Sequence, residues 1–300
     1  MRNRNLSRRR LLTSTATMAG AGLLIPSALA ACSRTEPGSG ASAEDTLKKI
    51  KEQGYVTVGF AGERPFGYKD GDKITGQGPE LHKAIWATLG VKEVRGKLVE
   101  FGSLIPGLNA NRFDSVAAGM YITPERCAQA QFSEPEYNMP ESFLVAKGNP
   151  KNITDYESLK KSGAKMGTLG GAVEVGYAKE FKISGVQTYD DVVSGRQAVE
   201  SGRIDAFAGT TLTLSTSLKE KPSGKLEVSE PFFPVIGGEK VNGAGASVFR
   251  KKDTSLREAY DKGLAELKSS GELLKILAPF GFTEDMLPGD DLTMKGLCAG

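Results

Sequence analysis

The sequence is short of the residue types from which most catalytic and metal sites are built. Its 300 residues include one histidine, His82, and three cysteines, and no HExxH, CxxC, GxSxG or GxxxxGK(S/T) pattern occurs. His82 lies in a predicted helix, where packing is a far commoner role than catalysis or metal binding. No nearby base is available to activate Cys127 as a nucleophile. These absences favour a binding protein over an enzyme, with no metal and no cofactor.

An excess of basic residues is also missing once the first 31 residues are set aside. The whole chain has 39 Lys and Arg against 36 Asp and Glu, but residues 1–31 hold five arginines and no acid. The remaining chain therefore has 34 basic residues and a net charge of −2. No basic surface for phosphate backbones is expected, so nucleic acid is excluded as a partner.

The apolar run near the N-terminus is too short to span a membrane. Residues 11–25 are rich in Thr, Ser, Gly and Ala, and they follow the twin-arginine pattern SRR at residues 7–9. The motif LAAC at residues 29–32 then has the small residues of a lipoprotein cleavage site. Residues 1–31 are therefore predicted to be a Tat-type lipoprotein signal peptide and Cys32 the lipidated N-terminus, with an ordinary cleaved signal as the alternative. The protein is expected to be exported and attached by lipid to the extracytoplasmic face of the membrane.

A flexible tether is predicted between this anchor and the folded body. Residues 32–45 are rich in Ser, Gly and Pro and show no apolar periodicity. About 255 residues follow, which suffice for one large or two medium lobes.

Short apolar runs alternate with helical patterns throughout the body. Strands are expected at residues 55–61, 97–101, 114–120, 165–171 and 205–209, and helices at residues 79–90, 103–112, 123–129, 172–181, 196–203 and 254–282. Ser103 and Thr123 are the candidate N-caps. This order predicts an α/β fold with largely parallel sheets. The similar runs RFDSVAAG and RIDAFAG occupy equivalent places in the two halves, which indicates two similar lobes.

Two segments combine Gly or Pro with a strand and are predicted to join the lobes as hinge strands, namely residues 137–150 and 242–253. The predicted lobes are therefore residues 46–139 with 247–300, and residues 140–246. Ligands bind beyond the carboxyl ends of the strands in open α/β sheets. A cleft site is expected, lined by the strand-end glycines Gly119 and Gly209.

Two cysteines remain after Cys32 is assigned to lipid. Cys127 and Cys298 belong to an exported chain, which favours a disulfide between them. Such a bond would attach the C-terminal tail to the body. Two separate thiols are the alternative.

The run GSLIPGLNANRFDSVAAGMYITPERCAQAQFSEPEY resembles the polar amino acid-type substrate-binding proteins of ABC importers. FAGERPFGY, EFGSLIPGL, GMYITPERC and the tail PFGFTEDMLPGDDLTMKGLC are similar, more closely, to the ectoine/hydroxyectoine-binding proteins. The resemblance covers essentially the whole mature body. It implies a two-lobe, type II periplasmic-binding-protein-like fold, a monomer that closes about its hinge on a small zwitterion, and delivery to ABC permease subunits in the membrane.

Departures from the general pattern point to the ligand. Thr210 stands where the resemblance leads one to expect an Asp that holds the ammonium of an α-amino acid, and Tyr121 stands where a small serine is usual. The second-lobe loop reads Gly170-Gly171-Ala172 in place of hydroxyl residues. An acid is lost and a ring is gained, which fits a diffuse cation such as the ectoine amidinium.

In the predicted site, different residues bind the anionic end and the cationic end of the ligand. The resemblance assigns the carboxylate to Arg126, whose planar fork binds it in a bidentate manner. The cation would lie among three rings and a hydrogen-bonding acid, with further contacts from the second lobe. The predicted ligand-binding residues are Glu63, Phe66, Phe101, Tyr121, Arg126, Gly171, Val173 and Thr210.

Each assignment has an alternative. Phe66 and Phe101 could be core rings, Glu63 a solvated acid, and Arg126 an ion-pair partner of Glu134 or Glu136. At the level of function, the ligand could be another polar amino acid or a betaine. The scaffold could also carry an exported, dehydratase-like enzyme, for which Glu63 is the one obvious proton donor or acceptor.

Overall fold

The computed structural model describes residues 43–299. The predicted signal peptide, Cys32 and all but the end of the predicted tether lie outside these residues. Among the described residues, no helix has both the length and the apolar character needed to cross a membrane.

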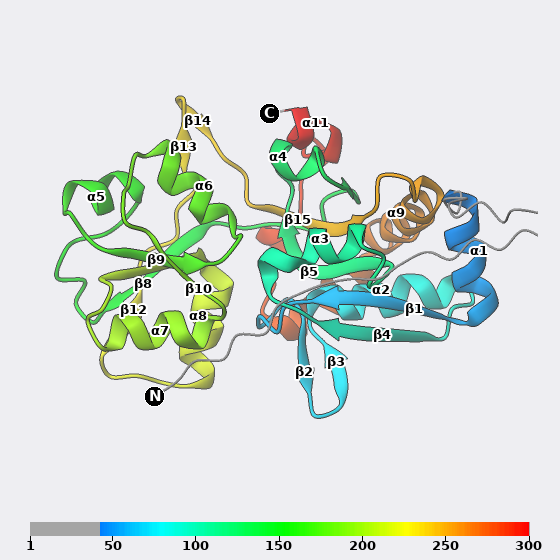
Figure 1. The fold of residues 1–300 in the computed structure, drawn as a ribbon, viewed down its shortest axis with the longest axis horizontal. Coiled ribbons are helices and arrows are strands. Elements are labelled where there is room, and N and C mark those ends of the chain that lie inside the picture. The colour runs from blue at the N-terminus through cyan, green and yellow to red at the C-terminus, as the bar shows by residue number, and fades with distance from the viewer. Residues whose placement is uncertain (1–42, 300) are drawn as a thin grey trace, which may run out of the picture. The chain divides into compact units, whose positions relative to one another are not determined.

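The first lobe is built on a mixed sheet in the order β4-β1-β5-β15-β6, with β7 also paired to β15 (Figure 1). β1 pairs in parallel with β4 and β5, whereas β15 runs antiparallel to β5, β6 and β7. The expectation of largely parallel sheets is therefore wrong for β15, the strand that the chain adds when it returns to this lobe. The strands are β1 (Tyr55–Phe60), β4 (Glu93–Leu98), β5 (Ser115–Tyr121), β6 (Gln131–Phe132), β7 (Tyr137–Asn138) and β15 (Ala244–Phe249).

The helices of the first lobe bury apolar residues against this sheet. α2 packs Leu81, Ile85 and Trp86 inward, with none of the three exposed. The helices are α1 (Ala43–Gln53), α2 (Gln77–Thr88), α3 (Leu104–Asn109), α4 (Pro124–Cys127), α9 (Thr254–Ser269), α10 (Glu272–Leu277) and α11 (Met294–Ala299), with the short turns η1 (Phe101–Ser103), η2 (Ala278–Phe280) and η3 (Glu284–Met286) and the hairpin of β2 (Tyr68–Asp70) and β3 (Lys73–Thr75).

His82 is a packing residue of this core. It is fully buried on α2, where Trp86 Nε1 donates to its Nδ1 at 2.9 Å and its Nε2 lies 3.0 Å from Ser247 Oγ. Burial lowers the pKa of His82 to about 3, so the ring is neutral near pH 7.

The second lobe has its own mixed sheet, in the order β10-β9-β11-β8-β12, and its own hydrophobic core. β9, β10 and β11 are parallel, and β8 runs antiparallel to β11 and β12. Its elements are β8 (Glu141–Ala146), α5 (Tyr156–Lys161), β9 (Met166–Leu169), α6 (Val173–Glu180), β10 (Gln187–Tyr189), α7 (Val192–Glu200), β11 (Ala206–Thr210), α8 (Thr211–Glu220), β12 (Leu226–Val228), β13 (Val235–Ile236) and β14 (Glu239–Lys240).

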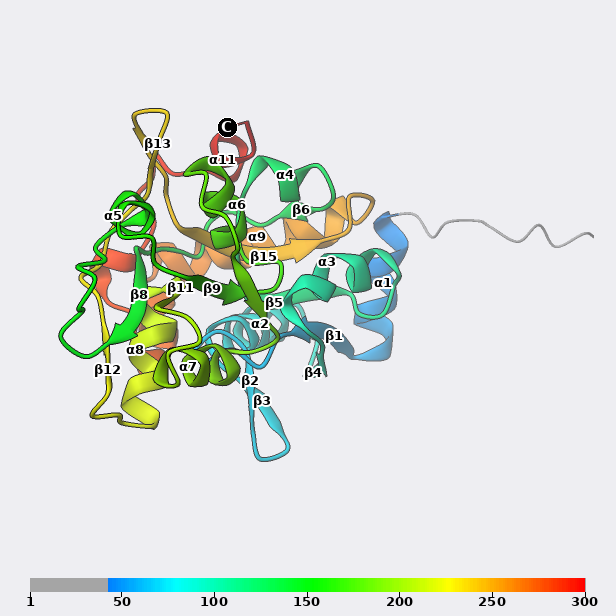
Figure 2. The ribbon, with the colours of Figure 1, turned by 60° about the vertical axis from the view of Figure 1, so that its left-hand side comes forward.

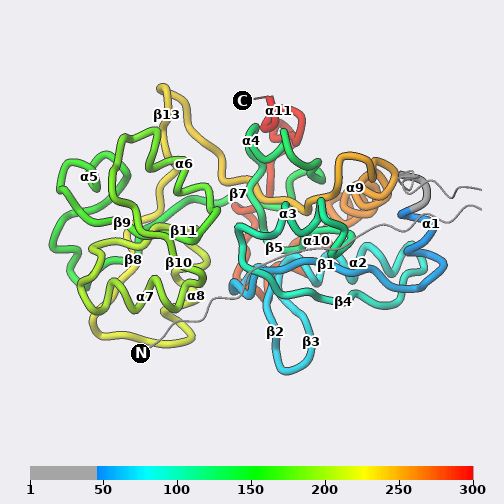
Figure 3. Tube along the Cα trace, in the orientation of Figure 1, coloured from blue at the N-terminus to red at the C-terminus, as the bar shows by residue number. Residues whose placement is uncertain are grey.

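The chain crosses between the sheets in two places, as the trace in Figure 3 shows. It leaves the first sheet after β7 and enters the second at β8, and it returns before β15. Both crossings fall within the predicted hinge segments. All of β15, from Ala244, belongs to the first sheet, three residues before the lobe boundary drawn from the sequence at residue 247.

Three local expectations differ from the structure. The strand expected at residues 97–101 is β4, which ends at Leu98, and Phe101 opens η1 instead. Ser103 makes no side-chain cap because it already lies inside the helical turn, with φ −92° and ψ −2°. The long final helix is interrupted at Gly271, whose φ of 73° does not allow α9 to continue.

The C-terminal tail is attached to the body beside α4. A disulfide joins Cys127 to Cys298 with a Cα–Cα distance of 5.7 Å, and Met294 N donates to Glu134 at 3.0 Å. Figure 2 shows α11 next to α4 in the turned view.

Candidate ligand-binding site

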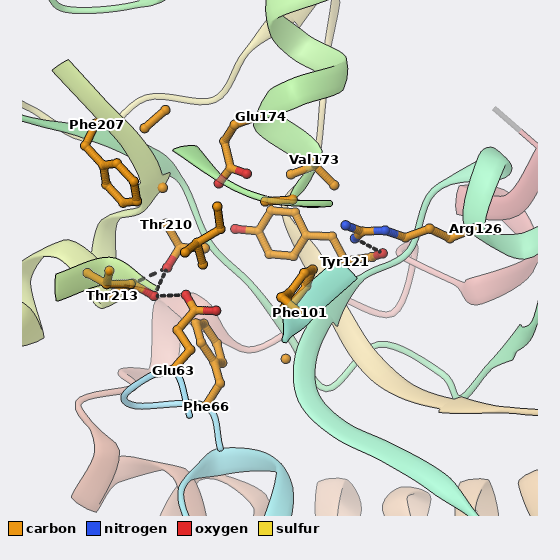
Figure 4. A pocket seen from close by; sticks show the side chains of 16 residues that line it. Glu63, Phe66, Phe101, Tyr121, Arg126, Val173, Glu174, Phe207, Thr210 and Thr213 are labelled. Carbon is orange, nitrogen blue, oxygen red and sulfur yellow. Dashed lines mark hydrogen bonds between the residues drawn. The ribbon is translucent and has the colours of Figure 1, made fainter. Parts of the chain in front are cut away.

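A cavity lies where the carboxyl ends of strands from both sheets meet (Figure 4). The first lobe contributes residues after β1, in η1, at the end of β5 and in α4, and the second lobe contributes residues around β9, α6, β11 and α8. Both strand-end glycines line it. Gly119 has a φ of 59°, and a Cβ there would lie 2.2 Å from the Phe66 ring, so only glycine lets this ring pack on the strand end.

Seven of the eight residues predicted for the site line this cavity. The exception is Gly171, which lines an adjoining groove between α4 and α6. Its carbonyl nevertheless accepts a hydrogen bond from Arg126. The lining residues that were predicted are Glu63, Phe66, Phe101, Tyr121, Arg126, Val173 and Thr210.

Arg126 is held by the turn that links β5 to α4. Thr123 is the N-cap of α4 and its hydroxyl accepts from Arg126 N at 3.3 Å, with Pro124 in the first turn. The guanidinium donates to Tyr121 O and to Gly171 O, each at 2.9 Å. Its Cζ lies 5.5 Å from the centroid of the Phe101 ring.

Arg126 makes no ion pair within the described residues. Glu136 instead accepts from Gln77, Ser247 and Tyr260, and Glu134 accepts from Met294 N. Two of the five N–H donors of the guanidinium are used by backbone carbonyls, which leaves the others for an anion.

The aromatic rings belong to the core and to the cavity at once. Phe66 is 1 % exposed and stacks on Tyr137 with the ring centroids 5.4 Å apart, yet it also lines the cavity. Tyr121 is 4 % exposed, and its hydroxyl donates to Met139 O at 3.4 Å. Phe101 is 9 % exposed and belongs to the apolar cluster of the first lobe that also contains Leu104 and Phe113. Phe66 and Phe101 are therefore core rings and also line the cavity, so the two roles are compatible.

Glu63 is a partly buried acid that faces the second lobe. Thr213 Oγ1 donates to Glu63 Oε1 at 2.7 Å. Thr210 supports this donor, because its hydroxyl caps α8 at Thr213 N and lies 3.0 Å from Thr213 Oγ1. Burial raises the pKa of Glu63 to about 7, the hydrogen bond from Thr213 opposes this, and the nearby Glu174 adds to it.

Two acids of the site were missed by reasoning from the sequence. Glu174, in the first turn of α6, lines the cavity, and Glu141, at the start of β8, is buried near it. Burial raises the pKa of both carboxyl groups. The available signal for Glu174 was its place one residue after Val173, at the N-terminus of a helix that borders the site.

The charged groups are separated within the cavity. In Figure 4 the guanidinium of Arg126 lies on one side of the Tyr121 ring, and the carboxyl groups of Glu63 and Glu174 lie on the other. Such an arrangement can hold a small molecule with an anionic and a cationic end. No group of three or more His, Cys, Asp and Glu suited to a metal occurs among residues 43–299.

The two lobes contact each other around the cavity. Arg126 Nη2 donates across the cleft to Gly171 O, and Thr213 donates across it to Glu63. Arg64 and Glu220 form an ion pair with an N–O distance of 3.2 Å. The structure therefore has the lobes closed over the site.

Comparison with known proteins places these features among solute-binding proteins. The model of the bacterial extracellular solute-binding proteins, family 3, matches residues 56–283. The chain is 34 % identical over 261 residues to the probable amino-acid ABC transporter periplasmic-binding protein y4tE of Sinorhizobium fredii, covering 85 % of this chain and 86 % of that one.

Solved structures show the same fold. The crystal structure of EhuB in complex with hydroxyectoine superposes with a TM-score of 0.78 at 33 % identity, covering 86 % of this chain and 98 % of that one. An ancestral arginine-binding protein bound to arginine gives a TM-score of 0.67 at 33 % identity, covering 76 % and 99 %.

Proposed function

Because this chain belongs to the bacterial extracellular solute-binding proteins, family 3, we propose that it captures ectoine or hydroxyectoine for an ABC importer. The family binds solutes and is not enzymatic. The chain is accordingly the extracytoplasmic binding protein of a transporter for polar, amino acid-like solutes, and its partners are the permease subunits of that transporter.

The observation that carries the ectoine proposal is the separation of charges across the aromatic rings of the cavity. The ligand carboxylate would accept from the free N–H groups of Arg126, and its amidinium ring would lie against Phe66, Phe101 and Tyr121. Glu63 would accept the ring N–H groups. An amidinium spreads its charge and is weakly hydrated, so rings can contact it at a small dehydration cost.

The binding residues are divided between the two lobes, so a bound ligand favours closure of the lobes. Arg126 and the rings belong to the first lobe, while Val173, Glu174 and Thr210 belong to the second. A ligand that contacts both lobes only when they meet stabilises the closed state by those additional contacts. The closed form is then the one that the permease recognises.

Calorimetric titration of the mature protein with ectoine, hydroxyectoine, proline, glutamate and arginine tests the substrate. Ectoine or hydroxyectoine should bind at least about tenfold more tightly than any of the three amino acids. Tighter binding of an amino acid would contradict ectoine as the ligand, but it would still agree with a solute-binding role for an ABC importer.

A cationic amino acid is the second candidate. Although Thr210 replaces the expected Asp, Glu63 and Glu174 still give the cavity two carboxyl groups that could hold a cation. In addition, one matched structure is an ancestral arginine-binding protein with arginine bound. The two candidates differ in shape, because arginine has a long flexible side chain and ectoine is a compact ring.

Export and lipid attachment complete the proposal. Residues 1–31 would direct Tat export, and Cys32 would carry the lipid that holds the protein at the membrane. A Cys32→Ser variant should be exported but released from the membrane fraction. Retention of that variant in the membrane would contradict the anchor.

A further inference from the structure

Two carboxyl groups of the second lobe, those of Glu141 and Glu174, lie next to each other at the wall of the cavity and affect each other's pKa, and only Glu174 lines the cavity. Glu174 lines the cavity and is 4 % exposed, whereas Glu141 is 1 % exposed and is not among the lining residues. Neither oxygen of Glu141 has a hydrogen-bond partner among the described residues. Glu174 Oε2, by contrast, accepts from Thr168 Oγ1 at 3.4 Å.

Two buried carboxylates in mutual contact cannot both be ionised at low cost, because each charge is desolvated and repels the other. One proton shared between them removes the repulsion. The proton is more stable on Glu141, which faces no cation and is the more deeply buried of the two, with the Tyr121 hydroxyl as its one other neighbouring donor. Glu174 is better able to keep a negative charge, because Thr168 donates to it and the charge of Arg126 attracts it.

We propose that Glu174 is the ionised acceptor of the second lobe for the cationic end of the ligand, and that Glu141 keeps it ionised by holding their shared proton. This inference rests on the proposed binding of a zwitterion. The cation then meets one carboxylate from each lobe, Glu63 and Glu174, so its attraction to the second lobe is realised only on closure. Glu174 thereby determines specificity for ligands with a positive ring or side chain.

The surroundings of Glu174 are consistent with this role. The titratable and polar groups that face it come from β5, β8, β9, α4, α5, α6 and the segment after β1, and they are Tyr121, Glu141, Thr168, Arg126, Tyr156, Tyr177 and Glu63. Arg126 is the one cation in this set. Its guanidinium donates to backbone carbonyls and forms no ion pair with Glu174 in the described structure. The charge of Glu174 is therefore available to a ligand.

Three isosteric variants separate this role from a structural one. Glu174→Gln removes the proposed acceptor, Glu141→Gln fixes the neutral form of the hidden partner, and Glu180→Gln is a control on the exposed end of the same helix. Each is titrated at pH 8 with ectoine and with 5-oxoproline, a ring acid whose lactam is neutral. Thermal unfolding of each variant verifies the fold.

Glu174→Gln should lose at least about tenfold in ectoine affinity and should narrow the preference for ectoine over 5-oxoproline by about the same factor. Glu141→Gln should keep most of the affinity and the preference. An unchanged preference in Glu174→Gln, or an equal loss in Glu141→Gln, would overturn the assignment. If the wild-type protein instead binds an amino acid, the proposed ectoine function fails, and the same variants are compared with that amino acid. Binding of no zwitterion at all would overturn both.

Discussion

Gly102 and Gly171 meet backbone to backbone across the cleft. Gly102 lies in η1 of the first lobe, and Gly171 lies between β9 and α6 of the second with a φ of 79°. A Cβ on Gly171 would lie 2.6 Å from Gly102 Cα, which is closer than real Cβ contacts allow. The closed arrangement of the lobes therefore depends on the absence of a side chain at this point.

Gly171→Ala should impair closure. The added methyl group meets the backbone of Gly102 only when the lobes close, so ligand affinity should fall by at least about tenfold. The positive φ also costs about 1 kcal/mol of stability. Gly185→Ala is the matched control, since its φ is 70° and nothing lies within 4 Å of the added Cβ. Equal affinities of the two variants would show that this contact does not limit closure.

Arg126→Lys should lose most of the ligand affinity. Lysine keeps the charge but cannot form the planar pair of hydrogen bonds, a loss of about 2 kcal/mol or about thirtyfold. Calorimetry measures the effect, with Arg112→Lys, an exposed site on the first lobe, as the control. An Arg126→Lys protein that binds like the wild type would place the ligand carboxylate elsewhere.

Phe101→Leu should weaken binding more than it weakens the fold. Leucine retains apolar volume but removes the π face, which contributes about 1 kcal/mol, or about fivefold in affinity, to a bound cation. Phe113→Leu changes a buried ring of the same cluster that does not line the cavity. It should lower the melting temperature without changing the affinity. If Phe101→Leu lowered the melting temperature without changing the affinity, Phe101 would be a core ring that does not contact the ligand.

Affinity for a zwitterion should fall as the pH decreases from 8 to 6. Burial raises the pKa of Glu63 to about 7, so this carboxyl group is increasingly protonated below that pH and no longer offers a charge to the ligand cation. Glu63→Gln should bind more weakly at pH 8 and show a smaller pH dependence. The exposed Glu157→Gln serves as the control. A wild-type affinity that rises on acidification would contradict the role of Glu63.

Much of the fold was predictable because its signals are local. The alternation of apolar runs and helical patterns located most strands, and Thr123 and Pro124 marked the start of α4 and so the place of Arg126. β4 was placed too late because it is an edge strand of the sequence EVRGKL, with charged and exposed residues in place of an apolar run. The antiparallel return of β15 depends on how the chain crosses back from the second lobe, which no local pattern records.

The incomplete part of the site prediction has a physical cause. Glu174 and Glu141 look like solvated acids at the start of a helix and of a strand, since nothing in their neighbours along the chain predicts burial. Both are buried among groups that are distant in sequence, namely Tyr156 and Tyr177 of the second lobe and Tyr121 of the first. Which acids line a site between two lobes therefore depends on tertiary contacts. The sequence shows that Thr210 replaces an acid, but it does not show that Glu174 adds one.

A crystal structure of the protein with bound ectoine tests the central claim most directly. The solute should lie in the cavity with its carboxylate on the Arg126 guanidinium and its ring against Phe66, Phe101 and Tyr121, within hydrogen-bonding distance of Glu63. A solute bound with its ring away from these three side chains, or with its carboxylate on a group other than Arg126, would contradict the account.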